Sequence, residues 1–233
     1  MRLSSRRALR WVLWGLFLFV PLAVIYQLTN VDTRLSDKDI AAFESVGLAR
    51  AKEALSFEQE VLLIRDTQGV ILQKSPLKKG IPKGASREPG DLFKYGYGLC
   101  YDRSRALDKA YKYLGFESRH VFMLYRRNDD PFWKVLLSRG RLSHAVTEVK
   151  TSRGWLVVDS TSPWVSVDKQ GNPLDADHMS LNPARFAGIP EYMARPAWSI
   201  RGLYSRHGQF FHAYPVGPEL SYVDFFRWWF GLV

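Results

Sequence analysis

The chain begins with an apolar stretch whose pattern differs from everything that follows. Residues 11–28 contain no charged side chain, and four arginines lie within residues 1–10. An apolar stretch of about 18 residues is long enough to cross the hydrocarbon core of a bilayer as a helix. Because the nearby positive charge lies on its N-terminal side, residues 1–10 are expected to stay cytoplasmic and the remainder to lie outside the cytoplasm. We therefore predict a single-pass transmembrane anchor over residues 11–28.

A cleaved signal peptide is the competing interpretation of the same stretch. Such a signal ends in a cleavage site with small residues at alternate positions, and no clean site of that kind follows the apolar run. Arg6 and Arg7 hint at a twin-arginine signal, although the residues after them match that signal poorly. The sequence therefore favours an uncleaved anchor.

Helical patterns follow the anchor at three places. Ser36 and Ser56 each begin an N-terminal capping signature. We predict one helix from Ser36 to about residue 55 and a second helix from Ser56 to about residue 66. From Cys100 to Leu114 apolar and small residues recur three and four positions apart, with charged residues on the remaining positions. Gly115 comes next, where a left-handed helix C-cap is easiest for glycine. We therefore predict a third helix over residues 100–114.

Strand patterns lie after this helix. Residues 143–150 and 155–160 are rich in β-forming residues and flank a short turn, which predicts a hairpin. Residues 120–125 and 133–137 are further candidate strands. A Lys-, Gly- and Pro-rich loop over residues 76–89 precedes the third helix and is interpreted as a connector rather than a mobile lid. An antiparallel sheet packed against the helix at residue 100 predicts an α+β fold.

Cys100 is the only cysteine of the 233-residue chain, so it cannot form an intramolecular disulfide. A free cysteine is often a small buried apolar residue. It can also be a nucleophile whose His and Asp partners come from elsewhere in the sequence. The position at the start of a helix favours the second interpretation, because unpaired backbone N–H groups and the helix dipole stabilise a thiolate. Gly96 and Gly98 give the backbone room to turn before the helix.

The predicted hairpin supplies the two partners. If Val149 pairs with Gly154 across a four-residue loop, His144 lies directly opposite Asp159 on the same face of the sheet. A slip by one residue would separate them. An aspartate opposite a histidine fixes its tautomer and stabilises the imidazolium. An ordinary exposed polar pair is the alternative.

The residues around these three positions resemble the transglutaminase-like superfamily. The resemblance rests on the order Cys, His, Asp and on four segments: 98–102 (GLCYD), 114–121 (LGFESRHV), 144–149 (HAVTEV) and 154–161 (GWLVVDST). It covers about 110 residues and implies a papain-like core in which Cys100 is the nucleophile, His144 the general base and acid, and Asp159 the residue that orients the histidine. Val146 and Ser160 depart from the family pattern, which usually has an aromatic residue and a proline there.

Other site assignments are less specific. The backbone N–H of Cys100 is one candidate for stabilising an oxyanion, and Tyr95 or Tyr97 is another. We expect no cofactor and no metal ion. Residues 175–178 (DADH) match no established metal-binding spacing and are interpreted as a polar turn. His207 and His212 are interpreted as surface or structural residues.

Charge and composition change this picture little. Without the four N-terminal arginines, the chain has 29 basic and 23 acidic residues, a net charge of +6. Because these charges are dispersed, a solvated basic surface is favoured over a nucleic-acid partner, and proximity to anionic lipid or an acidic polymer stays open. Residues 222–230 (YVDFFRWWF) are too short to span a bilayer, and they suit either the membrane interface or the protein core.

The sequence predicts a membrane-anchored thiol enzyme. We divide the chain into a basic tail at 1–10, the anchor at 11–28, a linker with a helix at 29–56, a catalytic core at 57–165, and an extension at 166–233 that packs on the core or on the membrane surface. The expected activity is Cys-thioester acyl transfer at amide bonds of a protein or peptide, either as a cysteine protease or other amide hydrolase or as an acyltransferase of the transglutaminase type. The alternative is a non-catalytic binding or scaffold protein in envelope polysaccharide or polymer assembly. In a Gram-negative cell the catalytic core would be periplasmic.

Overall fold

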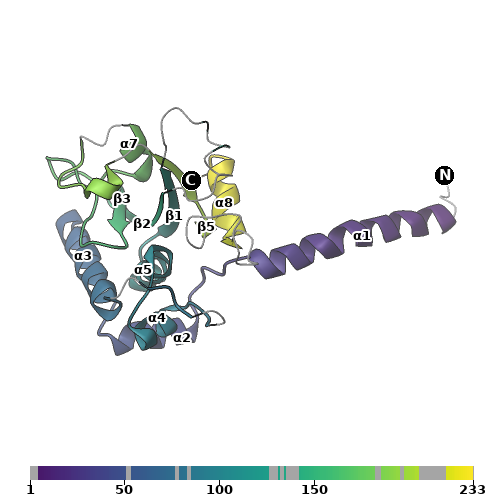
Figure 1. Ribbon diagram of the computed structural model, residues 1–233, viewed down its shortest axis with the longest axis horizontal. Coiled ribbons are helices and arrows are strands. Elements are labelled where there is room, and N and C mark those ends of the chain that lie inside the picture. The colour runs from purple at the N-terminus through teal and green to yellow at the C-terminus, as the bar shows by residue number, and fades with distance from the viewer. Residues whose placement is uncertain are drawn as a thin grey trace.

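The computed structural model describes residues 5–50, 54–76, 79–82, 85–125, 131, 134, 142–181, 185–194, 197–204 and 219–232. Its centre is a four-stranded antiparallel sheet in the order β3-β2-β1-β4 (Figure 1). The strands are β1 (Ser118–Tyr125), β2 (Ser143–Thr151), β3 (Gly154–Asp159) and β4 (Ala197–Arg201). A second, two-stranded sheet pairs β5 (Leu203–Tyr204) with β6 (Glu219–Leu220).

Helices cover one face of the larger sheet. The central one is α5 (Cys100–Leu114), which packs on β1 and β2. Around it lie α2 (Asp37–Ser45), α3 (Phe57–Lys74) and α4 (Pro89–Tyr95). Ile64, Leu107 and Leu156 are fully buried where α3, α5 and β3 meet, and they belong to the largest hydrophobic cluster. Burial of these apolar faces holds α5 on the sheet.

The opposite face of the sheet is covered by the chain after β3. Val121, Met123 and Val146 are fully buried there against Leu174 and Met179. Met179 lies on the short helix α7 (Ala176–Leu181). A 3₁₀ turn, η2 (Glu191–Met193), follows before the chain enters β4. Residues beyond position 165 therefore complete both the sheet and its core.

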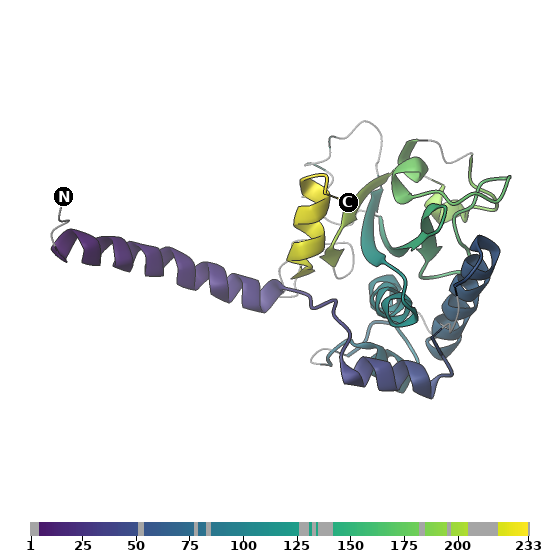
Figure 2. The same ribbon diagram turned by 180° about the vertical axis from the view of Figure 1, so that it is seen from behind.

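The C-terminal helix and the end of the N-terminal helix meet at one side of the domain. The C-terminal helix α8 (Tyr222–Trp229) packs Phe225 and Trp228 against a cluster that includes Phe122 and Ile200. The N-terminal helix α1 (Ser5–Thr29) projects away from this side of the domain (Figures 1 and 2). The residues of the predicted anchor, 11–28, lie within α1. Among the residues that the structure describes, no helix combines the length and the apolarity needed to cross a membrane.

The predicted helices are confirmed in position but not always in length. The structure places α5 at Cys100–Leu114, with Gly115 left-handed at φ 98°, as predicted. Ser36 and Ser56 cap α2 and α3 through reciprocal capping boxes. The helix after Ser36, however, ends at Ser45 instead of near residue 55, and the helix after Ser56 continues to Lys74 instead of ending near residue 66.

Two further elements differ from the expectation. The loop predicted over residues 76–89 ends where α4 begins, a helix that the sequence pattern does not predict. The candidate strand over residues 133–137 lies outside the described residues, apart from position 134, which is helical. The strand predicted at 120–125 is present and begins two residues earlier, at Ser118.

The hairpin register was predicted wrongly. Thr151 pairs with Gly154, so only two residues form the loop and Asp159 lies opposite Val146. Gly154 has φ 128°, a backbone conformation that allows the chain to turn within this shorter loop. The ladder is therefore shifted by two residues from the predicted one. Because side chains alternate with a period of two, His144 and Asp159 still share one face of the sheet.

Candidate active site

Cys100 is the first residue of α5, and the chain before it is arranged to bring the thiol to that position. Gly96 ends α4 in the left-handed conformation, with φ 67°. The Asp102 carboxylate accepts a hydrogen bond of 3.1 Å from the backbone N–H of Leu99, which caps the helix start. The thiol therefore sits at a capped helix N-terminus, where the helix dipole favours the thiolate.

Gly98 is required by close packing between α4 and α5. A Cβ atom at this position would lie 2.4 Å from Leu92 Cδ1 and 3.2 Å from Asp102 Cβ. Leu92 is fully buried in the main core, so its side chain has little room to move aside. The glycine two residues before the cysteine thus permits the tight approach that sets the beginning of α5.

His144 and Asp159 form a buried pair across the hairpin. Nε2 of His144 lies 2.6 Å from Oδ1 of Asp159. The His144 side chain is 8% exposed and that of Asp159 is fully buried. The two residues are diagonal neighbours on β2 and β3, because Asp159 is directly opposite Val146. With Nε2 engaged by the carboxylate, Nδ1 is the ring nitrogen left for the thiol.

Cys100 and His144 are hydrogen-bonded and shift each other's ionisation. Burial alone would raise the pKa of the Cys100 thiol, but the hydrogen bond and charge of His144 outweigh it and lower that pKa. Burial alone would lower the pKa of His144, but the hydrogen bonds to Asp159 and Cys100 raise it to about 9. Both shifts favour a thiolate–imidazolium ion pair near neutral pH.

Asp159 is held as a carboxylate by a dense set of hydrogen-bond donors. Oδ1 accepts from the backbone N–H of Thr161 at 3.1 Å, besides its contact with His144. Oδ2 accepts from the backbone N–H of Ser162 at 3.0 Å, from the Ser162 hydroxyl at 2.6 Å, and from the Tyr192 hydroxyl. Burial would raise the pKa of Asp159, yet these hydrogen bonds and His144 lower it. The residue that orients the histidine therefore stays charged.

Tyr192 is a residue of this site that no sequence pattern indicates. It lies on the η2 turn, and its hydroxyl donates to Asp159 and lies 3.0 Å from the Ser162 hydroxyl. Its ring meets the His144 ring edge to face, with centroids 5.4 Å apart. Burial and the Asp159 carboxylate raise the pKa of Tyr192, which keeps its proton available for donation. It follows Asp159 by 33 residues in the chain, and no motif connects the two.

Gln68 of α3 fixes the loop that follows Asp159. Its Nε2 donates to the backbone carbonyl oxygens of Asp159, Ser162 and Trp164, at 2.7, 2.9 and 2.9 Å. The side chain is buried, so these carbonyl groups find a partner away from water. Gln68 thereby holds the backbone that presents the Ser162 N–H to the Asp159 carboxylate.

Tyr95 and Tyr97 lie just before α5, with their rings tilted at 34° to each other and their centroids 5.8 Å apart. Lys94 lies over the Tyr95 ring and Lys79 over the Tyr97 ring. Within the described part of the chain, neither tyrosine hydroxyl hydrogen-bonds to the Cys100–His144–Asp159 group. Their role in oxyanion stabilisation stays a prediction.

No cluster suited to a metal ion occurs among the described residues. His178 instead pairs with Asp175, with Nδ1 and Oδ1 2.7 Å apart. The same oxygen accepts from the backbone N–H groups of Asp177 and His178 at the start of α7. Asp175 therefore caps α7, and residues 176–178 form the first turn of that helix instead of the polar turn that the sequence predicts. His207 and His212 lie outside the described residues.

A pocket of about 330 Å³ lies next to His144. Its walls are Tyr125, Leu142, Ser143, His144, Glu191 and Tyr192. Aromatic and aliphatic side chains thus face a cavity beside the imidazole, with one carboxylate from Glu191. Such a mixture of apolar walls and few polar groups is typical of a site that binds a small group of a substrate.

The comparisons with known proteins agree with this geometry. Residues 71–160 match the family model of the transglutaminase-like superfamily. The matched segment contains Cys100, His144 and Asp159, and the mixed helix and antiparallel sheet arrangement fits a transglutaminase-like α+β fold. No curated protein sequence matches the chain. The matched domain points to a papain-like thiol enzyme or a related fold.

Proposed function

We propose that this protein is a thiol enzyme that transfers acyl groups from amides through a thioester on Cys100. The observation that carries the proposal is the continuous arrangement of thiol, imidazole and carboxylate. Cys100 is hydrogen-bonded to His144, whose Nε2 lies 2.6 Å from the Asp159 carboxylate. A protein that only binds its ligand has no need of this arrangement.

In the proposed reaction the Cys100 thiolate attacks the carbonyl carbon of the amide. The tetrahedral intermediate collapses by breaking the C–N bond, and the His144 imidazolium gives its proton to the departing amine. The acyl group then remains on sulfur as a thioester. Water or a second amine attacks this thioester while His144 takes the proton of the nucleophile, and the thiolate leaves. Asp159 stabilises the imidazolium whenever it forms.

The substrate class follows from this chemistry. An amide in a peptide backbone or side chain supplies the acyl group, so the proposed partners are proteins or peptides, including components of envelope polymer assembly. Hydrolysis, as by a cysteine protease or amidase, is the default because water is far more abundant than any amine. Transamidation, an acyltransferase activity, requires a site that excludes water from the thioester.

We also propose that α1 attaches the enzyme to a membrane, with the catalytic domain outside the cytoplasm and in the periplasm of a Gram-negative cell. Residues 11–28 carry no charge. Large apolar side chains described in α1 are exposed, including Leu13, Phe17 and Ile25. An apolar surface of this extent in a helix that projects from its domain favours contact with lipid.

The proposed reaction is tested with p-nitrophenyl acetate, a simple acyl donor. The full chain should release nitrophenol in a burst and carry an acetyl group on Cys100, as measured by intact mass and peptide mapping. His144→Ala should slow the burst by at least about 100-fold, within the range typical of a lost general acid–base. His178→Ala is the matched control, because it removes another Asp-paired histidine outside the site.

The second product distinguishes the two acyl-transfer reactions. Release of acetate indicates hydrolysis, and formation of an N-acetyl amine from an added primary amine indicates transamidation. Absence of any acetyl-Cys100, with the protein folded, would contradict the enzyme proposal and favour the alternative of a non-catalytic scaffold.

A further inference from the structure

The helix α8 has two apolar faces, and only one of them is covered by the domain. Phe225 and Trp228 pack toward the sheet. Large hydrophobic residues on the other face and at the C-cap are 48–67% exposed, namely Val223, Phe226, Trp229 and, at the C-cap, Phe230. An exposed row that includes Trp and Phe is costly in water and marks a surface that meets an apolar partner.

This outer face is continuous with the end of α1. Tyr222 of α8 and Tyr26 of α1 have ring centroids 5.2 Å apart. The Tyr222 hydroxyl is 2.7 Å from the Thr29 hydroxyl. In both views of the molecule α8 runs across the direction of α1, at the side of the domain from which α1 projects (Figures 1 and 2). If α1 enters a lipid layer, α8 therefore lies along the surface of that layer.

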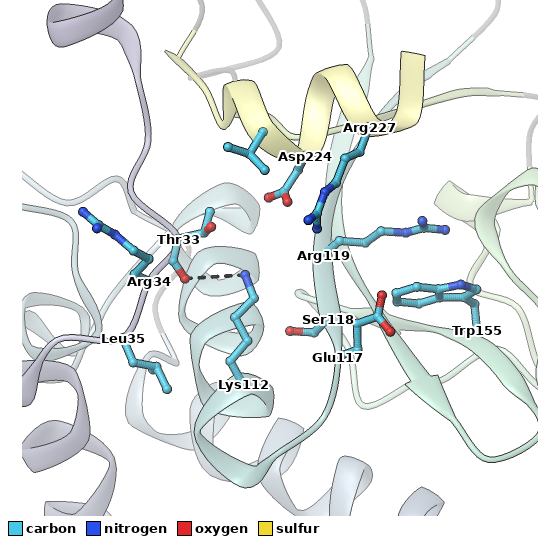
Figure 3. Close-up of a pocket in the computed structure, with 11 residues that line it drawn as sticks. Thr33, Arg34, Leu35, Lys112, Glu117, Ser118, Arg119, Trp155, Asp224 and Arg227 are labelled. Atoms are coloured by element: carbon cyan, nitrogen blue, oxygen red, sulfur yellow. Dashed lines mark hydrogen bonds between the residues drawn. The ribbon is translucent and has the colours of Figure 1, made fainter. Parts of the chain in front are cut away.

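A basic pocket of about 460 Å³ lies between α8, α5 and β1 (Figure 3). Its cationic lining comes from four side chains: Arg34, Lys112, Arg119 and Arg227. Glu117 and Asp224 are its only acidic lining residues among those described. Three of these four cations, all except Arg227, are already paired with carboxylates, so the positive charge open to an external anion is that of Arg227.

Arg227 is the cation best placed to meet an external anion. Figure 3 shows its side chain reaching from α8 into the pocket, on the side of Arg119. Among the described residues its guanidinium has neither a hydrogen bond nor an ion pair, whereas Arg119 is paired with Glu148 at 2.7 Å. An arginine with free donors in this position matches the bidentate geometry of a phosphate group.

We propose that the outer face of α8 is a lipid-binding surface that lies in the interface of a phospholipid bilayer, with Arg227 at the level of the headgroup phosphates. The inference rests on the proposed membrane attachment through α1. Tryptophan and tyrosine favour the interfacial region, and a helix with apolar and basic residues side by side lies in its plane. Contact with lipid at both α1 and α8 would fix the rotation of the domain about α1 and hold Cys100 in one orientation toward substrates at the membrane.

The lone cysteine makes a direct depth measurement possible. In a Cys100→Ser background of the full chain, Leu22→Cys, Phe226→Cys and Lys169→Cys each provide a single site for a nitroxide spin label. The protein is reconstituted in phosphatidylcholine–phosphatidylglycerol vesicles, and the collision rates of the label with oxygen and with a water-soluble nickel chelate are compared. Labels at positions 22 and 226 should collide more with oxygen, and the label at 169 more with nickel.

Each outcome separates this inference from the anchor on which it rests. A label at 226 that favours nickel while the label at 22 favours oxygen overturns the lipid surface and leaves the anchor standing. Both labels favouring nickel contradicts the anchor as well. The label at 226 could instead be shielded from both reagents, with its spectrum broadened by a second nitroxide nearby. That result would overturn the inference in favour of pairing between two copies of the chain.

The role of Arg227 is measured in the same vesicles. Raising the phosphatidylglycerol fraction should increase the oxygen preference of the label at 226, and Arg227→Gln should abolish this dependence. Arg185→Gln, which removes an exposed arginine that does not line the pocket, should leave the dependence intact. If both variants weaken this dependence on phosphatidylglycerol equally, the net charge of the protein alone accounts for it. That result would contradict a specific contact between Arg227 and a lipid headgroup.

Discussion

At the scale of single residues, the Asp159 carboxylate connects the site, because it contacts His144 and accepts hydrogen bonds from Ser162 and Tyr192. Cys100, His144 and Asp159 are recognisable because each residue type is unusual in its local pattern and the three occur in the order of a known family. Tyr192 and Gln68 carry no such signal. They reach Asp159 from a 3₁₀ turn and from α3, through hydrogen bonds that depend on tertiary structure alone.

The contact of Tyr192 with Asp159 makes it a positioning residue whose effect is measurable. Tyr192→Phe removes a donor to the carboxylate and keeps the ring against His144. Since a hydrogen bond to a charged group contributes about 1.5–3 kcal/mol when buried and this tyrosine is 41% exposed, we expect a loss near the lower limit, about tenfold in the acylation burst rate. Tyr222→Phe makes the same chemical change outside the site. Equal burst rates for Tyr192→Phe and the wild type would exclude the positioning role.

At the scale of elements, local signals predict where helices begin better than where they end. The capping serines and the periodicity of α5 are local, and all three predicted starts are confirmed. The length of α3 depends on its packing against α5, which sequence spacing does not reveal. The hairpin shows the same limit. Its strands and shared face follow from alternation, but the register depends on the two-residue loop at Gly154.

The junction of α4 and α5 gives a prediction at this scale. Gly98→Ala would place a Cβ atom 2.4 Å from buried Leu92, so α5 must shift or the core must strain. We expect a loss of about 1–3 kcal/mol in the free energy of unfolding, together with slower alkylation of Cys100.

Gly69→Ala is the matched control, because this helical glycine has open space around it. It should stabilise the protein by about 0.5–1 kcal/mol, through the better helix propensity of alanine. The two free energies are measured by urea denaturation. A Gly98→Ala variant as stable and as reactive as the wild type would contradict the packing argument.

At the scale of the whole molecule, segments far apart in sequence complete one domain. β4 joins β1 in the central sheet, and α8 covers part of it. Sequence patterns did not predict β4, because five residues with mixed character carry little signal on their own. His120 connects three parts of this assembly. Its Nδ1 lies 2.8 Å from the Ser104 hydroxyl of α5. Its ring stacks on the Tyr204 ring of β5, with the two centroids 3.8 Å apart.

The burial of His120 predicts how the stability of the whole domain depends on pH. Burial, assisted by the charges of Arg105 and Arg87, lowers its pKa to about 3 in the folded protein. The unfolded chain, with an ordinary pKa near 6.5, therefore takes up a proton that the folded chain does not. Stability from this residue is complete above about pH 6.5 and falls by about 1.4 kcal/mol per pH unit as the pH decreases toward 3.

Urea denaturation of the wild type and of His120→Asn between pH 7.5 and pH 4.5 measures the contribution of His120 to this pH dependence. The carboxylates contribute equally to both proteins, so their effect cancels in the difference between the two free energies of unfolding. The wild type should lose more stability than the variant over this range. Parallel losses would contradict a buried neutral histidine.

The central claim, an activated thiol in a Cys100–His144–Asp159 group, is tested most directly by the rate of Cys100 alkylation by iodoacetamide as a function of pH. Because the hydrogen bond and charge of His144 lower the pKa of the thiol, the wild type should react rapidly well below the ordinary pKa range of a cysteine. In His144→Ala the alkylation rate should increase only as the pH approaches the ordinary pKa of a cysteine. Asp159→Asn should change the pH dependence of the rate less than His144→Ala does. The contrary result is a Cys100 that stays unreactive until the protein is unfolded, or one whose profile His144→Ala leaves unchanged.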